Sequence, residues 1–235
     1  MLFLNNTLPP FEPYTMYHWI PLILAAVLGY IVITYSNRYL NERQKTGIGS
    51  LLALIPFSCI MFRMTYLLKV GSFDLKEDLP FYLCRFMALI LPYVFYKRNR
   101  FWLGILYFWI LVGTINANLT PDLLFAFPHF EYFVYWIYHA SLMVCIFYAI
   151  FVYRLSVGWK DYWNAVIATI LFTIFSAFAN KIFSANYNYL SAKPEVDSLL
   201  DFLGPWPWYI LSVYTLMFAL FFVVLIPFLK RKKRH

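Results

Sequence analysis

One apolar run has an unusual opening, Leu79-Pro80-Phe81-Tyr82-Leu83-Cys84-Arg85-Phe86, and it ends at the basic turn 97–100. An apolar run of this length between charged ends is typical of a membrane-spanning helix. Cys84 and Arg85 lie about six residues beyond Asp78, which is ~9 Å into the bilayer at ~1.5 Å per residue. An arginine at that depth is costly, so it indicates a functional site or a buried partner.

The composition is that of a membrane protein. Of the 235 residues, 63% are hydrophobic and only 13% are charged, whereas soluble domains carry about 25% charged residues. The net charge of +8 comes from short loops and the C-terminal tail, so we expect no nucleic-acid partner. We expect the basic tail to contact anionic lipid head groups.

The cysteines and histidines show no spacing that holds a metal ion. Cys59, Cys84 and Cys145 lie within apolar runs, and no CxxC motif or Cys/His cluster is present. The sequence therefore predicts no disulfide framework, no metal site and no cofactor.

The apolar runs predict an all-α membrane protein, with one seven-transmembrane-helix bundle over residues 1–235. We expect helices over residues 17–36, 48–68, 79–96, 101–119, 130–153, 162–183 and 205–229.

Loop charges predict the orientation of this bundle. Thirteen lysines and arginines fall in 38–45, 97–100, 154–160 and 230–234, and four lysines and most acidic residues fall on the other side. By the positive-inside rule, the N-terminus is expected outside and the C-terminus in the cytoplasm.

Polar residues cluster at one depth of the expected helices. They fall ~5–13 Å below the outer boundary, which predicts a polar pocket in the outer leaflet. The residues placed in this layer are Arg63, Cys84, Arg85, Asn116, His139, Asn180 and Lys181.

A cysteine and a histidine on neighbouring helices can form a nucleophile and base pair. We expect Cys84 to form an acyl thioester and His139 to transfer the proton, with Arg63 and Arg85 favouring the thiolate or binding a phosphate. Asn116, Asn180 and Lys181 are expected to contact the substrate. Glu131, Asp122 and Tyr135 are expected to support the site, as anions near the arginines and as a polar strip beside His139.

Other interpretations of the same residues stay open at this point. Cys84 could equally be a small residue that packs in the core. Arg63 and Arg85 could equally form ion pairs between helices, with Glu131 and Asp122 as partners. At the level of function, the alternatives are a transporter or binding protein for a small anionic solute or lipid head group, and a receptor-like or structural protein.

Several motifs resemble those of a known family over roughly two-thirds of the chain. They are Leu79-Pro80-x-x-Leu83-Cys84, Thr120-Pro121-Asp122-Leu123, Phe127-Pro128-His129, His139, Asn186-Tyr187-x-Tyr189-Leu190 and Ser198-Leu199-Leu200-Asp201-x-Leu203-Gly204-Pro205-Trp206-Pro207-Trp208-Tyr209. Together they resemble the bacterial YwaF-like integral membrane proteins.

The resemblance carries expectations about activity and location. The YwaF-like family is similar to a eukaryotic membrane protein of the TMEM class that acts as a phospholipid acyltransferase, and distantly to androgen-induced membrane hydrolases with a Thr/His pair. By position it implies Cys84 as nucleophile and His139 as base, acting on a membrane lipid in the bacterial cytoplasmic membrane. Tyr82 departs from the family pattern, in which many members carry His or Gln.

Overall fold

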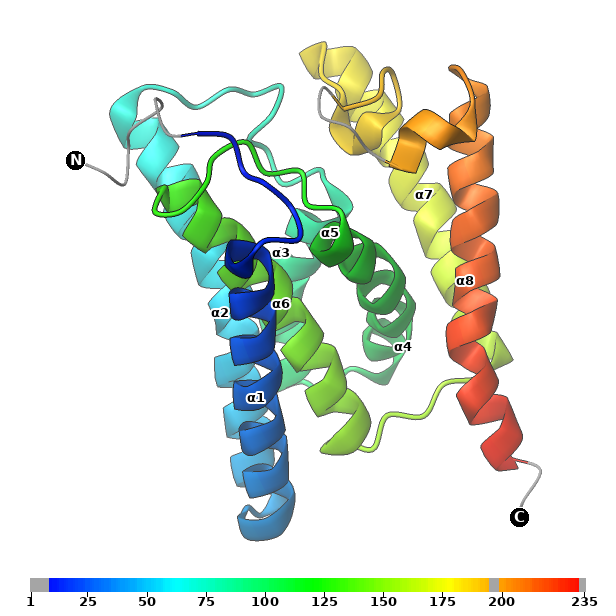
Figure 1. The fold of residues 1–235 in the computed structure, drawn as a ribbon. Helices are drawn as coiled ribbons and strands as arrows, with labels where there is room; N and C mark the ends of the chain where they lie inside the picture. Colours follow the sequence, from blue (N-terminus) through cyan, green and yellow to red (C-terminus); the bar gives the residue numbers. More distant parts are fainter. Residues whose placement is uncertain (1–8, 195–198, 233–235) are drawn as a thin grey trace.

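The computed structural model describes residues 9–194 and 199–232, and the part of the chain that it describes contains helices but no β-strand. Figure 1 shows a bundle in which α6 lies beside α1 and α2, while α7 and α8 lie together on the opposite side. The elements in chain order are α1 (Met16–Tyr39), α2 (Glu42–Val70), α3 (Leu83–Tyr96), α4 (Arg100–Trp109), a π-helical turn (Ile110–Thr114), α5 (Ile115–Leu119), α6 (Phe130–Phe151), α7 (Trp159–Phe183), two short 3-10 turns (Tyr187–Tyr189 and Leu199–Leu203) and α8 (Trp208–Lys232).

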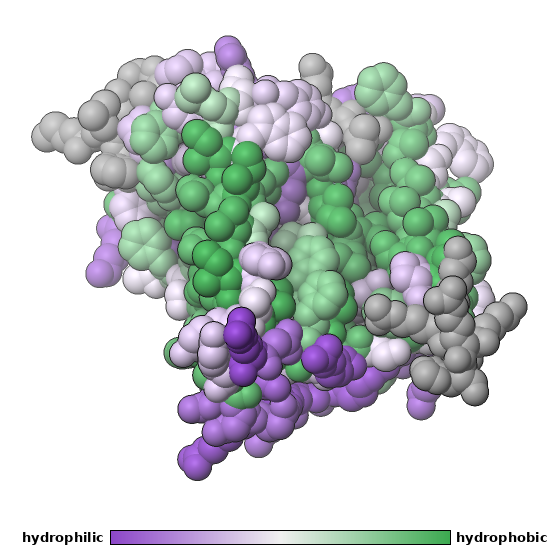
Figure 2. Space-filling view, turned by 60° about the horizontal axis from the view of Figure 1, so that its bottom comes forward, coloured by the Kyte–Doolittle hydropathy of each residue, from purple (hydrophilic) through white to green (hydrophobic). Residues whose placement is uncertain are grey.

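Six of the helical segments are long and apolar enough to cross a membrane, counting Arg100–Leu119 as one continuous segment. Apolar side chains cover the flanks of the bundle, and hydrophilic residues gather at one end (Figure 2). This hydrophilic end includes the end of α1 and the start of α2, and we call it the basic face, after Arg38, Arg43, Lys97, Arg98 and Arg100. The protein is therefore a multi-pass membrane protein.

The third helix is shorter than predicted. We expected it over 79–96, but α3 has 14 residues and begins at Leu83, so it is ~21 Å long at ~1.5 Å per residue. Pro80 disfavours the helical conformation at Leu79, and Phe81 N–H bonds back to the Leu79 carbonyl at 2.8 Å instead. Cys84 consequently lies in the first turn of the helix.

Two other predicted boundaries move for local reasons. The second helix starts at Glu42 rather than 48, because Asn41 and Gln44 form a capping box that supports a polar first turn. The last helix starts at Trp208 rather than 205, after the prolines at 205 and 207. Hydropathy alone identifies neither boundary.

The core of the bundle is centred on α6. This helix contacts α1, α2, α3 and α4, and its side chains Leu142, Cys145, Ile146 and Ala149 are almost fully buried. By contrast, α1 and α8 keep many large apolar side chains exposed, as expected of helices that face lipid.

An ion-pair network joins α2, α6 and the loop before α3. Arg63 Nη1 lies 2.6 Å from Asp78 Oδ1, and Arg63 Nε lies 3.0 Å from both carboxylate oxygens of Glu131. The side chains of Arg63 and Asp78 are only 17% and 6% exposed. We expected Glu131 to be one possible partner of Arg63, whereas Asp78 was not foreseen.

Removing Arg63 should destabilise the protein strongly. Arg63→Gln would leave the Asp78 and Glu131 carboxylates close together without their cation, and breaking a buried ion pair from one side costs about 3–5 kcal/mol. Thermal unfolding in detergent, followed by near-ultraviolet circular dichroism, measures the loss. Glu42→Gln is the control, because it removes a 69% exposed carboxylate from the Arg98 pair and should have a much smaller effect. Equal losses in the two variants would contradict the assigned role.

Candidate functional site

Cys84 and Arg85 occupy the first turn of α3, and a loop between α7 and α8 caps that turn. The Leu83 N–H donates to Asn188 Oδ1 at 3.0 Å. The Asn188 Nδ2 group donates to the Phe81 carbonyl at 2.8 Å and contacts Ser176 Oγ at 2.9 Å. One side chain therefore satisfies both a free amide of the helix start and a carbonyl before it.

A π-helical turn brings Thr114 to the same place. The turn Ile110–Thr114 interrupts the segment that begins at Arg100, and such turns often occur at functional sites. Thr114 is fully buried, and its hydroxyl interacts with the Cys84 thiol. Among the described residues, it has no hydrogen-bond partner of normal geometry.

His139 approaches from α6 and is almost fully buried. Its Nδ1 lies 3.0 Å from the Tyr135 carbonyl oxygen. Because a carbonyl only accepts hydrogen bonds, Nδ1 carries the proton and Nε2 keeps a free lone pair. The Tyr135 hydroxyl donates to the Ala117 carbonyl at 2.7 Å, which fixes α6 against α5.

Tyr138 links the cysteine to the histidine. Its hydroxyl interacts with the Cys84 thiol, and its ring centroid lies 3.8 Å from that of His139. The site thus gathers a thiol, two hydroxyls and an imidazole from α3, the π-helical turn and α6. A thiol and an imidazole are groups that can serve as nucleophile and base.

Arg85 supplies the charge nearest to this group. It interacts electrostatically with Cys84, Tyr138 and His139. Its guanidinium donates to the Glu77 carbonyl and lies 4.8 Å from the centroid of the Tyr82 ring. Within residues 9–194 and 199–232, no carboxylate lies within ion-pair distance of Arg85.

The other predicted substrate-binding residues have different surroundings. Arg63 is held by Asp78 and Glu131, and Asn180 bonds to both the N–H and the carbonyl of Tyr187 at 2.7 and 3.0 Å. Asn116 and Lys181 are exposed. Of the predicted substrate-binding set, Arg85, the sequence neighbour of Cys84, is the member that interacts electrostatically with His139.

Asp122 pairs with a tyrosine rather than with an arginine. It accepts a hydrogen bond from the Tyr189 hydroxyl, and burial first, then the charge of Asp122, raises the pKa of Tyr189. The Tyr189 hydroxyl therefore stays protonated and donates its hydrogen bond to the Asp122 carboxylate. A tie between Asp122 and Arg85, which the sequence left open, is not formed.

Sequence reasoning missed three residues of this site. None of the three carries a charge: Thr114 lies in an apolar run, Tyr138 precedes His139, and Asn188 lies in a polar loop. A search for charged or ionisable residues at one membrane depth therefore does not find them. The sequence did offer one signal for Asn188, because it lies inside the motif Asn186-Tyr187-x-Tyr189-Leu190. Within the described ranges, no group of three His, Cys, Asp or Glu side chains is placed to hold a metal ion.

Comparison with known proteins identifies the family of this chain. The model of the TMEM164 family matches residues 13–225. An uncharacterized protein of Treponema pallidum (strain Nichols) is 25% identical over 160 residues, which cover 68% of this chain and 65% of the relative. The chain thus spans about two-thirds of the length of this curated relative. No solved structure matches the chain.

The cap on α3 leads to a prediction about local order. Asn188→Gly removes the amide but keeps a backbone that accepts the φ of 56° found at this position. We expect a local loss of about 1–2 kcal/mol at the start of α3, seen as faster amide hydrogen exchange in residues 81–86. Asn116→Ala removes an exposed amide and should leave this exchange unchanged. Unchanged exchange in Asn188→Gly would show that the loop does not hold the helix.

Proposed function

Because this chain belongs to the TMEM164 family, we propose that it is a membrane-embedded lipid acyltransferase or acyl hydrolase that uses Cys84 and His139. The observation that supports the proposal most directly is Tyr138, whose hydroxyl interacts with the Cys84 thiol and whose ring centroid lies 3.8 Å from that of its sequence neighbour His139. The resemblance to YwaF-like proteins and to a phospholipid acyltransferase points in the same direction.

In the proposed reaction, Cys84 Sγ attacks the carbonyl carbon of a lipid ester. His139 Nε2 takes the thiol proton and returns it to the alcohol that leaves, so a thioester and a lysolipid result. A second lipid hydroxyl, or water, then attacks the thioester while His139 accepts its proton, and the proton passes to the released thiolate. Transfer and hydrolysis differ only in this second acceptor.

Arg85 and Thr114 have distinct proposed roles in that sequence. The Arg85 guanidinium lacks a carboxylate partner in the described part of the chain, so its charge is available to a phosphate head group or to the developing oxyanion. The Thr114 hydroxyl, buried and without a regular partner, is a further donor to the oxyanion. Arg63 instead holds helices together, since its charge is already neutralised by Asp78 and Glu131.

We place the protein in the bacterial cytoplasmic membrane, with the N-terminus outside, the C-terminus in the cytoplasm and the site in the outer half of the bilayer. The support is the uneven distribution of basic loop residues. Membrane lipid is the proposed substrate, and anionic lipid the proposed partner of the basic tail.

A second candidate function is binding or transport of a small anionic solute or lipid head group. The observation that favours it is the unneutralised Arg85 charge, and in that case Cys84 takes no part in the function. Cys84→Ser separates the two, because it should abolish an acyl-transfer enzyme and leave anion binding almost unchanged.

The acyl-transfer proposal is tested by trapping the nucleophile. Purified protein is treated with a long-chain acyl probe that carries a thiol-directed electrophile, and the labelled peptide is identified by mass spectrometry. We expect labelling on Cys84, loss of labelling in Cys84→Ala, and labelling at least about 100-fold slower in His139→Gln, the size typical of losing a general base.

Cys59→Ala is the matched control, because Cys59 packs beside the apolar core and should not affect labelling. Equal labelling in Cys84→Ala would remove the cysteine as nucleophile. If a fluorophosphonate lipid probe then labels Cys84→Ala but not Thr114→Val, the nucleophile is the threonine instead.

A further inference from the structure

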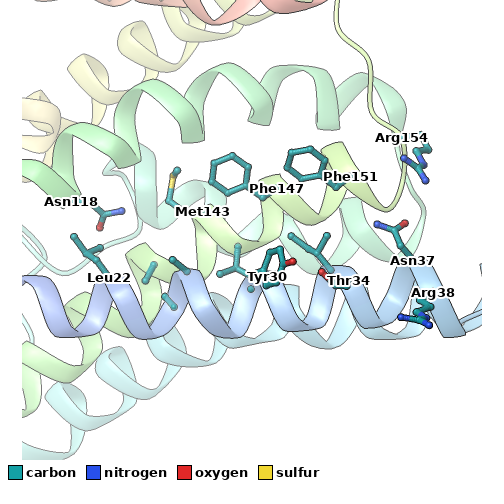
Figure 3. Close-up of a pocket in the computed structure, with 16 residues that line it drawn as sticks. Leu22, Tyr30, Thr34, Asn37, Arg38, Asn118, Met143, Phe147, Phe151 and Arg154 are labelled. Atoms are coloured by element: carbon teal, nitrogen blue, oxygen red, sulfur yellow. The ribbon is translucent and has the colours of Figure 1, made fainter.

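A long groove lies between α1 and α6, and neither Cys84 nor His139 lines it. It has a volume of about 810 Å³ and is also bordered by Asn118 of α5 and by Arg154, which follows α6. Figure 3 shows the α1 and α6 side chains on both sides of this groove. From Leu22 to Arg38, α1 extends over ~24 Å at ~1.5 Å per residue. That is longer than one hydrocarbon leaflet of ~15 Å.

The walls of the groove are apolar along most of this length. Met143, Phe147 and Phe151 recur along one face of α6, and Gly29 and Ile33 of α1 also line the groove. No aspartate or glutamate lines the groove. Its chemistry is therefore suited to a hydrocarbon chain, and it offers no carboxylate to a cationic head group.

One end of the groove is cationic. Arg38, Asn37 and Arg154 lie together at this end in Figure 3, on the basic face. Elsewhere on that face, Arg98 pairs with Glu42 and Arg100 with Asp161, both at 2.8 Å.

Neither groove arginine has such a partner. Within the described ranges, no carboxylate lies within ion-pair distance of Arg38 or Arg154. The two charges therefore remain available to an anion at the membrane surface.

The other end of the groove is marked by Asn118. This side chain is only 7% exposed, and its Oδ1 atom has no hydrogen-bond partner among the described residues. The apolar lining therefore gives way to an amide side chain at this end of the groove. The groove thus has a charged entrance, an apolar middle and a polar far end.

We propose that this groove binds an anionic glycerophospholipid from the leaflet at the basic face. Arg38 and Arg154 hold its phosphate, Asn37 donates to a phosphate or glycerol oxygen, and one acyl chain lies between α1 and α6 towards Asn118. Charge complementarity and the apolar walls select this ligand over a zwitterionic lipid, for which the groove has no carboxylate. The site does not depend on the proposed Cys84 chemistry.

The test measures lipid binding to the full chain in detergent by native mass spectrometry. The three probes are phosphatidylglycerol, phosphatidylcholine and glycerol 3-phosphate. We expect phosphatidylglycerol to bind at least tenfold more tightly than phosphatidylcholine, and glycerol 3-phosphate not to compete. Competition by glycerol 3-phosphate would make this a site for a soluble phosphate, and equal affinity for the two lipids would refute head-group recognition.

Two pairs of variants locate the site. The double variant that combines Arg38→Gln and Arg154→Gln should lower phosphatidylglycerol affinity about tenfold or more, as expected for the loss of two arginine contacts. Arg43→Gln with Lys97→Gln removes the same charge from the same face outside the groove and should have little effect. Equal losses would show general attraction to a basic surface rather than a site.

A bulky residue in the groove tests the acyl chain separately. Ala26→Trp fills the apolar middle and should also lower affinity, whereas Val27→Trp adds the same ring at an exposed neighbouring position outside the lining and should not. Full binding by Ala26→Trp would refute occupation of the groove by a chain. Cys84→Ala should keep lipid binding, so failure of the acyl-transfer proposal is recognised independently.

Discussion

Polar groups within an apolar bundle must find their partners inside the protein, and this requirement organises the structure. In hydrocarbon an unpaired charge or backbone group costs several kcal/mol. Arg63 meets the requirement with two carboxylates, Asp78 and Glu131. The start of α3 meets it with the Asn188 side chain. In both cases, a loop residue pairs with a helix group that would otherwise lack a partner: Asp78 with the Arg63 guanidinium, and Asn188 with the Leu83 N–H.

The site around Cys84 follows from the same requirement. Because Pro80 delays α3, the first turn of this helix lies inside the bundle, and its amide groups need a cap from elsewhere. In the same turn, the Cys84 thiol interacts with Thr114 of the π-helical turn and with Tyr138 of α6. The shortened helix therefore places the thiol of Cys84 in the first turn of α3, near the hydroxyls of Thr114 and Tyr138, and the proposed acyl transfer further requires the imidazole of His139 to reach it.

The basic face differs from the site in how its charges are used. Glu42 and Asp161 neutralise Arg98 and Arg100, and these pairs tie α2 to the turn after α3, and α4 to α7. The arginines beside the α1 groove lack such partners in the described chain. A membrane protein can leave a cation unpaired where lipid phosphates supply the counter-charge, which is the physical basis of the proposed lipid site.

The sequence by itself determined the class of the protein and its helices. Apolar length and loop charge are local properties, so the approximate positions of the helices in the described part of the chain follow from them. The boundaries differ where Pro80, the Asn41 cap or the prolines at 205 and 207 act, and a π-helical turn interrupts the segment predicted over 101–119. The tertiary structure alone decided which polar groups meet. It gave Arg63 a second partner in Asp78, placed Thr114 and Tyr138 near the thiol and left Asn116 exposed. The physical reason is that partner choice depends on the rotation and register of packed helices, which the packing of the whole bundle sets.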